Sequence, residues 1–209
     1  MRNSSKFLVI GASGHAGVIL DELHKNDSKS DILLCDDNLG LQCCGYKVHA
    51  SIEELILKKI YLNREIIIGI GDNSVRKEIF CNLNDLHGVK FCNVISKDSY
   101  VSKFSTLGFG NLVVTGAIIN HGVVIGNNSI INTSATVDHE CTIGSNVHIA
   151  PGVNLAGNVK VCDDVLIGIG ASIAPNIKIG KNCLIGSGAV VIKDVKPNTT
   201  VLGNPADEK

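Results

Sequence analysis

An aliphatic residue recurs at every sixth position from Ile95 to Val191, and this repeat is the strongest pattern in the chain. All 17 positions of the series carry Ile, Leu or Val. A period of six matches neither an α-helix nor the simple alternation of a half-buried strand. It is typical of a parallel β-helix, whose short repeats cannot bury an apolar face alone and must stack on one another. Three such repeats would close one triangular coil, so we expect residues 18 apart to lie in register.

The first 94 residues follow a different pattern, in which short apolar runs alternate with helix-like segments. The predicted strands are Lys6 to Ile10, Asp31 to Cys35, Glu65 to Ile70 and Lys90 to Val94, and the predicted helices are Val18 to Leu23, a helix capped by Ser51, and Val75 to Leu83. Alternating strands and helices predict a small parallel, Rossmann-like α/β sheet, with a ligand beyond the carboxyl ends of its strands. We therefore expect an α/β domain over residues 1–94 and a parallel β-helix over residues 95–209.

Composition narrows the class of partner. The 209 residues carry a net charge of −1 with both signs mixed, which argues against a nucleic-acid or membrane-surface partner. The chain opens without a secretory leader and its apolar runs are too short to span a bilayer, so a cytoplasmic protein is expected. The eight cysteines form no C-x-x-C pair, and Cys141 and Cys183 fall on inward places of the repeat, so reduced thiols are expected.

A glycine-rich loop follows the first predicted strand. Gly11, Gly14 and Gly17 would let the backbone approach a diphosphate at a helix N-terminus, where free N–H groups favour anions. The spacing G-x-x-G-x-x-G differs from the G-x-G-x-x-G of dinucleotide enzymes, which makes a nicotinamide cofactor a weak match. Asp36 and Asp37 end the second predicted strand, where an acid commonly accepts a hydrogen bond from a nucleoside. These residues predict a nucleotide or nucleotide-sugar pocket, and a tight turn followed by two solvated acids is the alternative.

Polar residues in the coil are informative because a flat β-helix face has no structural need for them. Asp138, His139 and Glu140 follow one another, and His121 lies one coil before His139. A histidine beside carboxylates can act as a general base, and the alternative is an ordinary surface histidine. A metal site is not favoured, because the side chains of Asp138 and His139 should point to opposite faces. Gly157, 18 residues beyond His139, should leave room for a ligand chain.

Several short stretches together resemble one enzyme family. They are Gly11-Ala12-Ser13-Gly14-His15, Asp36-Asp37, Gly71-Asp72-Asn73-Ser74-Val75-Arg76, Asn132-Thr133-Ser134, Asp138-His139-Glu140-Cys141 and Ala156-Gly157-Asn158-Val159. Over nearly its whole length the chain resembles the acetyl-CoA-dependent sugar acetyltransferases of the bacterial sialic acid O-acetyltransferase type. It looks most like the branch that N-acetylates nucleotide-linked 4-amino-4,6-dideoxysugars, which includes the bacillosamine, viosamine and perosamine pathway enzymes. The resemblance implies a homotrimer whose α/β domain binds the nucleotide sugar and whose left-handed β-helix binds acetyl-CoA between subunits.

The resemblance also assigns roles residue by residue. His139 matches the general base, Glu140 its acidic partner, His148 a residue near the thioester, and Gly157 a backbone contact to the pantetheine arm. The nucleotide-sugar pocket is matched by Gly11, Ser13, Gly14, His15, Asp36, Asp37, Asn73 and Arg76, and Asn132 matches a substrate contact beside the base. The C-terminus departs from the family pattern, because an acidic residue, Asp207, follows Gly203-Asn204-Pro205-Ala206 where a basic one is usual.

The implied reaction is direct transfer of an acetyl group from acetyl-CoA, without a metal. A sugar amine must lose a proton before it attacks a thioester, and a histidine base suits that step near neutral pH. Cys141 is expected to be a core residue rather than a nucleophile, because it falls on an inward place. Two other functions stay open. One is O-acetylation of a free sialic or related nonulosonic acid, and the other is a non-catalytic nucleotide-binding scaffold.

Overall fold

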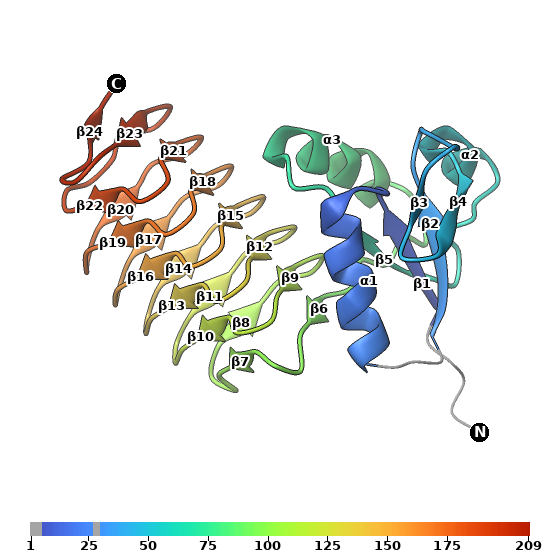
Figure 1. Cartoon of the computed structure of the whole chain (residues 1–209), viewed down its shortest axis with the longest axis horizontal. Helices are drawn as coiled ribbons and strands as arrows, with labels where there is room; N and C mark the ends of the chain where they lie inside the picture. Colours follow the sequence, from blue (N-terminus) through green and yellow to red (C-terminus); the bar gives the residue numbers. More distant parts are fainter. Residues whose placement is uncertain (1–5, 27–29) are drawn as a thin grey trace. The chain divides into compact units, whose positions relative to one another are not determined.

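The computed structural model describes residues 6–26 and 30–209, and Figure 1 traces the chain. The chain divides into two compact units, one ending at Val94 and one running from Ile95 to Lys209. Each unit has its own hydrophobic core. Among the described residues, the longest apolar helix falls short of what would be needed to cross a membrane.

The first unit is built on a five-stranded sheet in the order β3-β4-β2-β1-β5. Its strands are β1 (Lys6–Ile10), β2 (Asp31–Cys35), β3 (Gln42–Cys43), β4 (Tyr46–Ala50) and β5 (Glu65–Ile68). Strand β1 pairs in parallel with β2 and with β5, and β4 pairs in parallel with β2. The parallel core of this sheet confirms the predicted α/β class, and the carboxyl ends of β1, β2 and β5 share one edge.

The described residues of this unit form three helices: α1 (Gly14–Asn26), α2 (Ile52–Leu57) and α3 (Asn73–Asn84). Ser51 caps α2 as predicted, and its hydroxyl accepts from the N–H of Glu54 while the Glu54 carboxylate accepts from the N–H of Ser51. Helix α1 begins at Gly14, earlier than the predicted start at Val18, so the glycine loop itself forms the helix N-terminus.

One sequence-based prediction in this unit was wrong, and one pair of strands was not predicted. The run from Lys90 to Val94 forms only an isolated bridge between Phe91 and Ile66, because its apolar residues are few and the chain leaves the sheet there to enter the coil. The hairpin of β3 and β4 was not predicted, since its strands are short and partly polar.

The second unit is a parallel β-helix of two-residue strands in three sheets. Partners lie 18 residues apart, as in the pairs Ile119–Val137 and Ile125–Ile143, which confirms the predicted register. The repeating strands are β6 (Val94–Ile95), β7 (Tyr100–Val101), β8 (Thr106–Leu107), β9 (Leu112–Val113), β10 (Ile118–Ile119), β11 (Val124–Ile125), β12 (Ile130–Ile131), β13 (Thr136–Val137), β14 (Thr142–Ile143), β15 (His148–Ile149), β16 (Asn154–Leu155), β17 (Lys160–Val161), β18 (Leu166–Ile167), β19 (Ser172–Ile173), β20 (Lys178–Ile179), β21 (Leu184–Ile185) and β22 (Val190–Val191).

The coil closes with a short irregular end. Strand β23 (Thr200–Leu202) pairs in parallel with β21, and β24 (Asp207–Glu208) pairs with β23 in antiparallel fashion. The inward aliphatic residues of the repeat form one continuous core down the coil. The turns between strands therefore form columns of stacked corners, and the candidate catalytic residues lie on one of these columns.

Candidate active site

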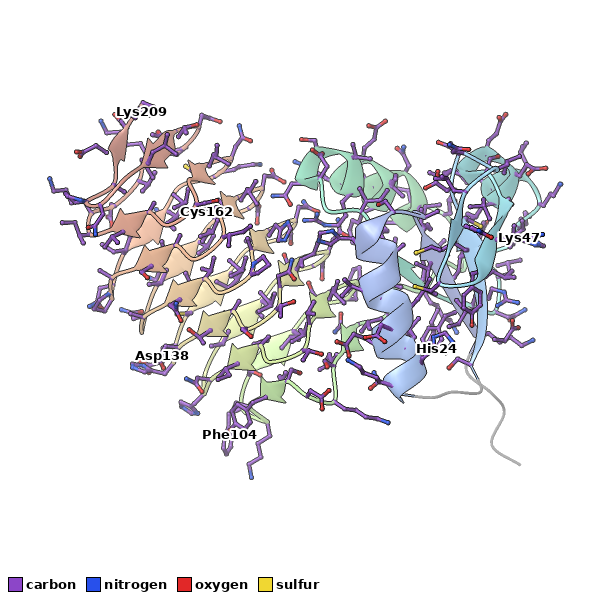
Figure 2. The ribbon with its side chains drawn as sticks, in the orientation of Figure 1. His24, Lys47, Phe104, Asp138, Cys162 and Lys209 are labelled. Carbon is purple, nitrogen blue, oxygen red and sulfur yellow. The ribbon has the colours of Figure 1, made fainter. Side chains whose placement is uncertain are left out.

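The corner between β13 and β14 carries His139 and Glu140. The backbone fixes this turn on both sides, because the N–H of Glu140 donates to the carbonyl of His121 at 2.9 Å and the N–H of Asn158 donates to the carbonyl of His139 at 2.9 Å. These bonds join the turn to the preceding and the following coil. Figure 2 labels the neighbouring Asp138 at this edge of the coil, together with Phe104. The corner is therefore a rigid support for a reactive side chain.

The imidazole of His139 and the carboxylate of Glu140 form an accessible pair. Their Nδ1 and Oε2 atoms lie 3.5 Å apart, and the side chains are 57% and 67% exposed. A carboxylate at Nδ1 favours the tautomer in which Nδ1 carries the proton and Nε2 is free to accept one. This is the arrangement that a general base requires, with the ring still open to a substrate.

Glu140 adopts a backbone conformation that is costly for its residue type. Its φ is +59°, in the left-handed region that glycine and asparagine enter most easily. In the coil, every other non-glycine residue with positive φ is Asn, Asp or Ser. A long carboxylate at such a corner is unusual, and unfavourable backbone geometry of this kind concentrates at functional sites.

Asp138 holds the turn in place. Its Oδ1 accepts from the N–H of His139 at 2.7 Å and from the side-chain amide of Asn120 at 3.0 Å. The bond from the His139 N–H, and then the one from Asn120, lowers the pKa of Asp138 below its ordinary value. Sequence reasoning missed Asn120, although its position 18 residues before Asp138 places it on the same column.

Gly157 is required by the position of the His139 ring. A Cβ atom at residue 157 would lie 2.6 Å from both Cε1 and Nε2 of His139. The space above Gly157 was expected to receive a ligand chain, and the structure fills it with the imidazole instead. The predicted backbone contact between Gly157 and the pantetheine arm stays a prediction. Gly157 also has a second role, because it leaves the space that the His139 ring occupies.

His121 lies one coil before His139, in the register that the 18-residue spacing predicted. Its ring packs edge-on against Phe104, with ring centroids 5.5 Å apart and planes inclined by 71°. Lys103 places its Nζ 4.9 Å from the centre of the Phe104 ring. His121 therefore has an aromatic neighbour, whereas His139 has a carboxylate, and only the second environment is suited to a base.

Asn132 and His148 form a separate pair. The amide of Asn132 donates to Nε2 of His148 at 3.1 Å, and both side chains are buried. His148 opens strand β15 on a flat side of the coil, and Asn132 stands at the corner between β12 and β13. The strand β13 lies between that corner and the corner that carries His139. Asn132 does not lie beside His139 within one chain, so its predicted substrate contact would need a neighbouring copy.

Cys141 is a core residue, as predicted. Its side chain is fully buried and its Sγ donates to the carbonyl of Ala156 at 3.2 Å. Burial raises the pKa of the Cys141 thiol above its ordinary value. A protonated, enclosed thiol is a poor nucleophile, so acetyl transfer through Cys141 is not supported.

The glycine loop of the first unit lies at the carboxyl end of β1. Gly11 has φ +107°, and a Cβ there would come within 2.9 Å of the carbonyl oxygen of Gly69. Ser13 is exposed, and a Cβ at Gly14 would meet nothing within 4 Å, so the first turn of α1 faces open space. A helix N-terminus with accessible N–H groups suits an anion such as a diphosphate.

Asp36 and Asp37 bind the backbone around this loop. The Asp36 carboxylate accepts from the N–H of Ala12 at 2.9 Å and from the N–H of Asn38 at 2.9 Å, and Asp37 accepts from the N–H of Ile52 at 3.0 Å. Asp36 is half-buried and Asp37 is exposed. Asp36 therefore orders the glycine loop, whatever contact it makes with a nucleoside.

His15 extends from the first turn of α1 toward Gly71. A Cβ at residue 71 would lie 2.7 Å from Cε1 of His15, so Gly71 makes the space that the ring occupies. Burial, and then the charge of Arg76, lower the pKa of His15. A neutral imidazole at neutral pH follows, which can donate one hydrogen bond and accept another. The motif that contains Gly71 did not predict this packing.

Arg76 and Asn73 belong to the start of α3, which Asp72 caps. The Arg76 guanidinium is 1% exposed and donates to the carbonyls of Ile70 and Gly71 and to Oδ1 of Asn73. Burial lowers the pKa of Arg76 to about 10, so the group stays charged at neutral pH. Arg76 is placed to shape the segment after β5, and its predicted contact with a substrate stays a prediction.

In the residues described, no three His, Cys, Asp or Glu side chains gather closely enough to hold a metal ion. All eight cysteines are free thiols.

Known domains match both units. Residues 6–83 match the PglD N-terminal domain, and residues 122–157 and 158–193 match the bacterial transferase hexapeptide (six repeats). None of the curated proteins compared with the chain matches it significantly. These two matches account for the α/β unit and for most of the coil.

Solved structures resemble the whole chain. The acetyltransferase domain of PglB from Neisseria gonorrhoeae FA1090, in complex with acetyl coenzyme A, is 32% identical, with a TM-score of 0.93 over 99% of this chain and 100% of that one. PerB from Caulobacter crescentus, in complex with CoA and GDP-perosamine, is 32% identical, with a TM-score of 0.89 over 99% and 97%. WeeI from Acinetobacter baumannii AYE is 28% identical, with a TM-score of 0.88 over 98% and 100%.

Proposed function

Because this chain belongs to the acetyl-CoA-dependent sugar acetyltransferases that join a PglD N-terminal domain to a left-handed hexapeptide β-helix, we propose that it N-acetylates the 4-amino group of a nucleotide-linked 4-amino-4,6-dideoxysugar. The observation that carries this proposal is the accessible His139–Glu140 pair on a rigid corner of the coil. Two of the similar structures hold such ligands, acetyl-CoA in the PglB domain and CoA with GDP-perosamine in PerB, which supports both the acetyl donor and the class of acceptor.

The glycine loop supplies the nucleotide side of the proposal. Its helix N-terminus is open at Ser13 and Gly14, and Asp36 holds the loop through the N–H of Ala12. A free sialic acid has no diphosphate for this loop to bind. The loop therefore favours a nucleotide-linked sugar over the alternative of O-acetylation of a free nonulosonic acid.

His139 is the proposed general base. Its Nε2 accepts a proton from the sugar amine as the amine nitrogen attacks the thioester carbon, and Glu140 stabilises the resulting imidazolium from the Nδ1 side. The tetrahedral intermediate then collapses, the carbon–sulfur bond breaks, and the imidazolium returns the proton to the leaving thiolate of CoA. The products are the N-acetylated sugar and free CoA, and the base regains its starting form.

The proposal includes no acyl-enzyme. The enclosed thiol of Cys141 belongs to the core series of the repeat, so the acetyl group passes directly between two bound substrates. Initial-rate plots should intersect, as a ternary complex requires, and Cys141→Ser should keep most of the wild-type kcat. Parallel initial-rate plots, or an acetylated Cys141 trapped by rapid quench, would contradict direct transfer.

A homotrimer completes the proposal. Asn132 and His148 lie away from His139 within one chain, so a neighbouring coil would have to bring them to the same acetyl-CoA. Beside the His121–His139 column, Tyr100 and Ile118 are exposed and lie in register on neighbouring strands, and Phe104 is exposed in the turn after β7. Exposed apolar side chains of this kind are suited to self-association. Sedimentation and activity measured at the same concentration test this, and a fully active monomer would disprove it.

The decisive experiment is a substrate panel. Thiol release from acetyl-CoA is measured with 4-amino-4,6-dideoxysugars linked to UDP, dTDP and GDP, and with free sialic acids as the comparison. We expect turnover with at least one nucleotide sugar and an acetamido group at C4 of the product by NMR. Turnover of free sialic acid alone, with an O-acetyl product, would replace this proposal by the O-acetyltransferase alternative.

A further inference from the structure

Two adjacent cysteines form the tip of the β3–β4 hairpin beside the glycine loop. Cys43 ends β3, and the turn Cys44-Gly45 leads into Tyr46 of β4. Cys44 and Gly45 have φ values of +50° and +84°, the pattern of a tight two-residue turn with both central residues in the left-handed region. A cysteine is an uncommon choice there, since Asn, Asp and Gly adopt this conformation more easily.

The two thiols contact each other and the first turn of α1. The Sγ atoms of Cys43 and Cys44 lie 4.0 Å apart. Cys43 Sγ is 3.8 Å from the carbonyl oxygen of Ser13, and Cys44 Sγ is 4.0 Å from that of Gly17. A Cβ at Gly17 would approach both sulfurs, at 3.4 and 3.7 Å. Both thiols therefore pack against Gly17, the third glycine of the loop.

We propose that Cys43 and Cys44 are a peroxide-sensitive thiol pair, whose conversion to a vicinal disulfide displaces the glycine loop and weakens binding of the nucleotide sugar. The last clause rests on the function proposed above. In a reducing compartment, disulfides that do form are commonly transient and redox-sensing, which is the behaviour proposed here.

The chemistry proceeds in two balanced steps with a hydroperoxide as oxidant. The exposed thiol of Cys44 takes one oxygen from hydrogen peroxide to become a sulfenic acid, and one water leaves. The thiol of Cys43 then attacks the sulfenic sulfur, the S–S bond forms, and a second water leaves. Cys44 is the more exposed of the two thiols, which suits it as the thiol oxidised first. Burial, and then the neighbouring Cys44, raise the pKa of Cys43.

The geometry explains why the loop must respond. A disulfide draws its two sulfurs to about 2.05 Å, and the thiols start at 4.0 Å. Both sulfurs touch α1, so the hairpin tip cannot contract without changing its contacts to Ser13 and Gly17. The two thiol protons that face these carbonyls are also lost. The N-terminal turn of α1, which carries the N–H groups proposed to hold the diphosphate, then loses part of its support.

The test uses the full-length enzyme, reduced or treated with hydrogen peroxide and then freed of it. Peptide mapping should show that the segment carrying Cys43 and Cys44 has lost two hydrogens and resists alkylation until it is reduced. Amide exchange over residues 11–17 should be faster in the oxidised protein. The KM for the nucleotide sugar should rise roughly fivefold, the equivalent of about one hydrogen bond, while the KM for acetyl-CoA stays unchanged.

Cys44→Ser is the test variant and Cys81→Ser is its matched control, since both replace an exposed cysteine. Cys44→Ser should lose all three responses to peroxide, and Cys81→Ser should keep them. Recovery of Cys43 and Cys44 as separate thiols or separate oxidised acids would overturn the proposal, as would a vicinal disulfide that leaves amide exchange over residues 11–17 unchanged. If the reduced enzyme acetylates no nucleotide sugar, the proposed function fails, and peptide mapping with amide exchange still decides the thiol proposal.

Discussion

The glycine loop of the α/β unit and the His139 corner of the coil use their polar groups in opposite ways. Around the loop, Arg76 is 1% exposed and donates to carbonyls of its own chain, and both oxygens of Asp36 accept from backbone N–H groups. At the corner, the side chains of His139 and Glu140 are 57% and 67% exposed and pair with each other rather than with the backbone. The difference indicates a preformed binding structure in one unit and accessible reactive atoms in the other.

This contrast predicts which kinetic parameter each region controls. Substitutions at the corner should act on kcat, because a general base contributes to the transition state. Substitutions around the loop should act on the KM for the nucleotide sugar, because they remove binding remote from the reacting atoms.

The largest effect is expected at the base. His139→Ala should lower kcat by about 10²- to 10⁴-fold with little change in either KM, because the amine loses its proton acceptor. His121→Ala is the matched control one coil earlier, where the ring packs against Phe104, and it should keep most of the activity. Steady-state kinetics with both substrates varied measure both variants. If His121→Ala abolished turnover and His139→Ala spared it, the base would be assigned to the wrong coil.

A smaller effect is expected when the base is displaced. Gly157→Ala puts a methyl group where the His139 ring lies, at 2.6 Å from Nε2, so the ring must move and kcat should fall roughly tenfold or more. Gly170→Ala is the control, because its Cβ would meet nothing within 4 Å. It should cost only about 1 kcal/mol of stability through its positive φ. Unchanged kcat in Gly157→Ala would contradict the seating role, and a raised KM for acetyl-CoA would support the predicted pantetheine contact.

In the loop, Asp36→Ala should raise the KM for the nucleotide sugar roughly tenfold and leave the KM for acetyl-CoA unchanged. The variant removes the acceptor for the N–H of Ala12, a charge-assisted bond of about 1.5–3 kcal/mol. Asp31→Ala is the control, since Asp31 pairs with Arg64 at the start of β2, whereas Asp36 directly follows the end of that strand. Equal increases in both KM values for Asp36→Ala would count against a nucleotide site at this loop.

The smallest effect concerns the acid stability of the corner. The pKa of Asp138 is lowered in the folded protein, so its ionised form stabilises the fold at neutral pH, and this contribution is lost as the pH falls below its ordinary value of 3.8. Asp138→Asn keeps an oxygen acceptor for His139 and Asn120 without titrating. The urea midpoint of unfolding is measured for both proteins at about pH 7 and about pH 3. The decrease in the midpoint between these two pH values should be smaller in the variant than in the wild type. Identical acid dependence would show that Asp138 does not stabilise the turn through its charge.

The sequence predicted the backbone elements of these two regions better than the packing of their side chains. The aliphatic repeat set the coil register because one buried residue in six is a strict requirement, and the strands at Lys6–Ile10 and Asp31–Cys35 followed from compact apolar runs. Lys90 to Val94 failed as a strand because its apolar residues are few, and it pairs with β5 only through the bridge between Phe91 and Ile66. The packing of His139 over Gly157 was also missed, because sequence spacing gives the column and not the side-chain rotamer.

The candidate site was predicted as a set of residues and not as an arrangement. The motif placed His139, Glu140, Asn132 and His148 together by family resemblance, and the structure separates them into an exposed pair and a buried pair. Hydrogen-bond partners from neighbouring coils, such as Asn120, become visible only when residues 18 apart are compared. Positions that depend on a second copy of the chain leave no signal in the periodicity of one chain.

A double-mutant cycle in kcat and KM tests the central claim most directly, namely that the coil corner performs the chemistry and the glycine loop binds the nucleotide. The wild type, His139→Ala, Asp36→Ala and the double variant are measured with both substrates varied. The account predicts that the double variant has the kcat of His139→Ala and the nucleotide-sugar KM of Asp36→Ala, because independent sites add in free energy. A double variant in which the KM effect disappears, or in which Asp36→Ala alone lowers kcat as far as His139→Ala does, would contradict this division of roles.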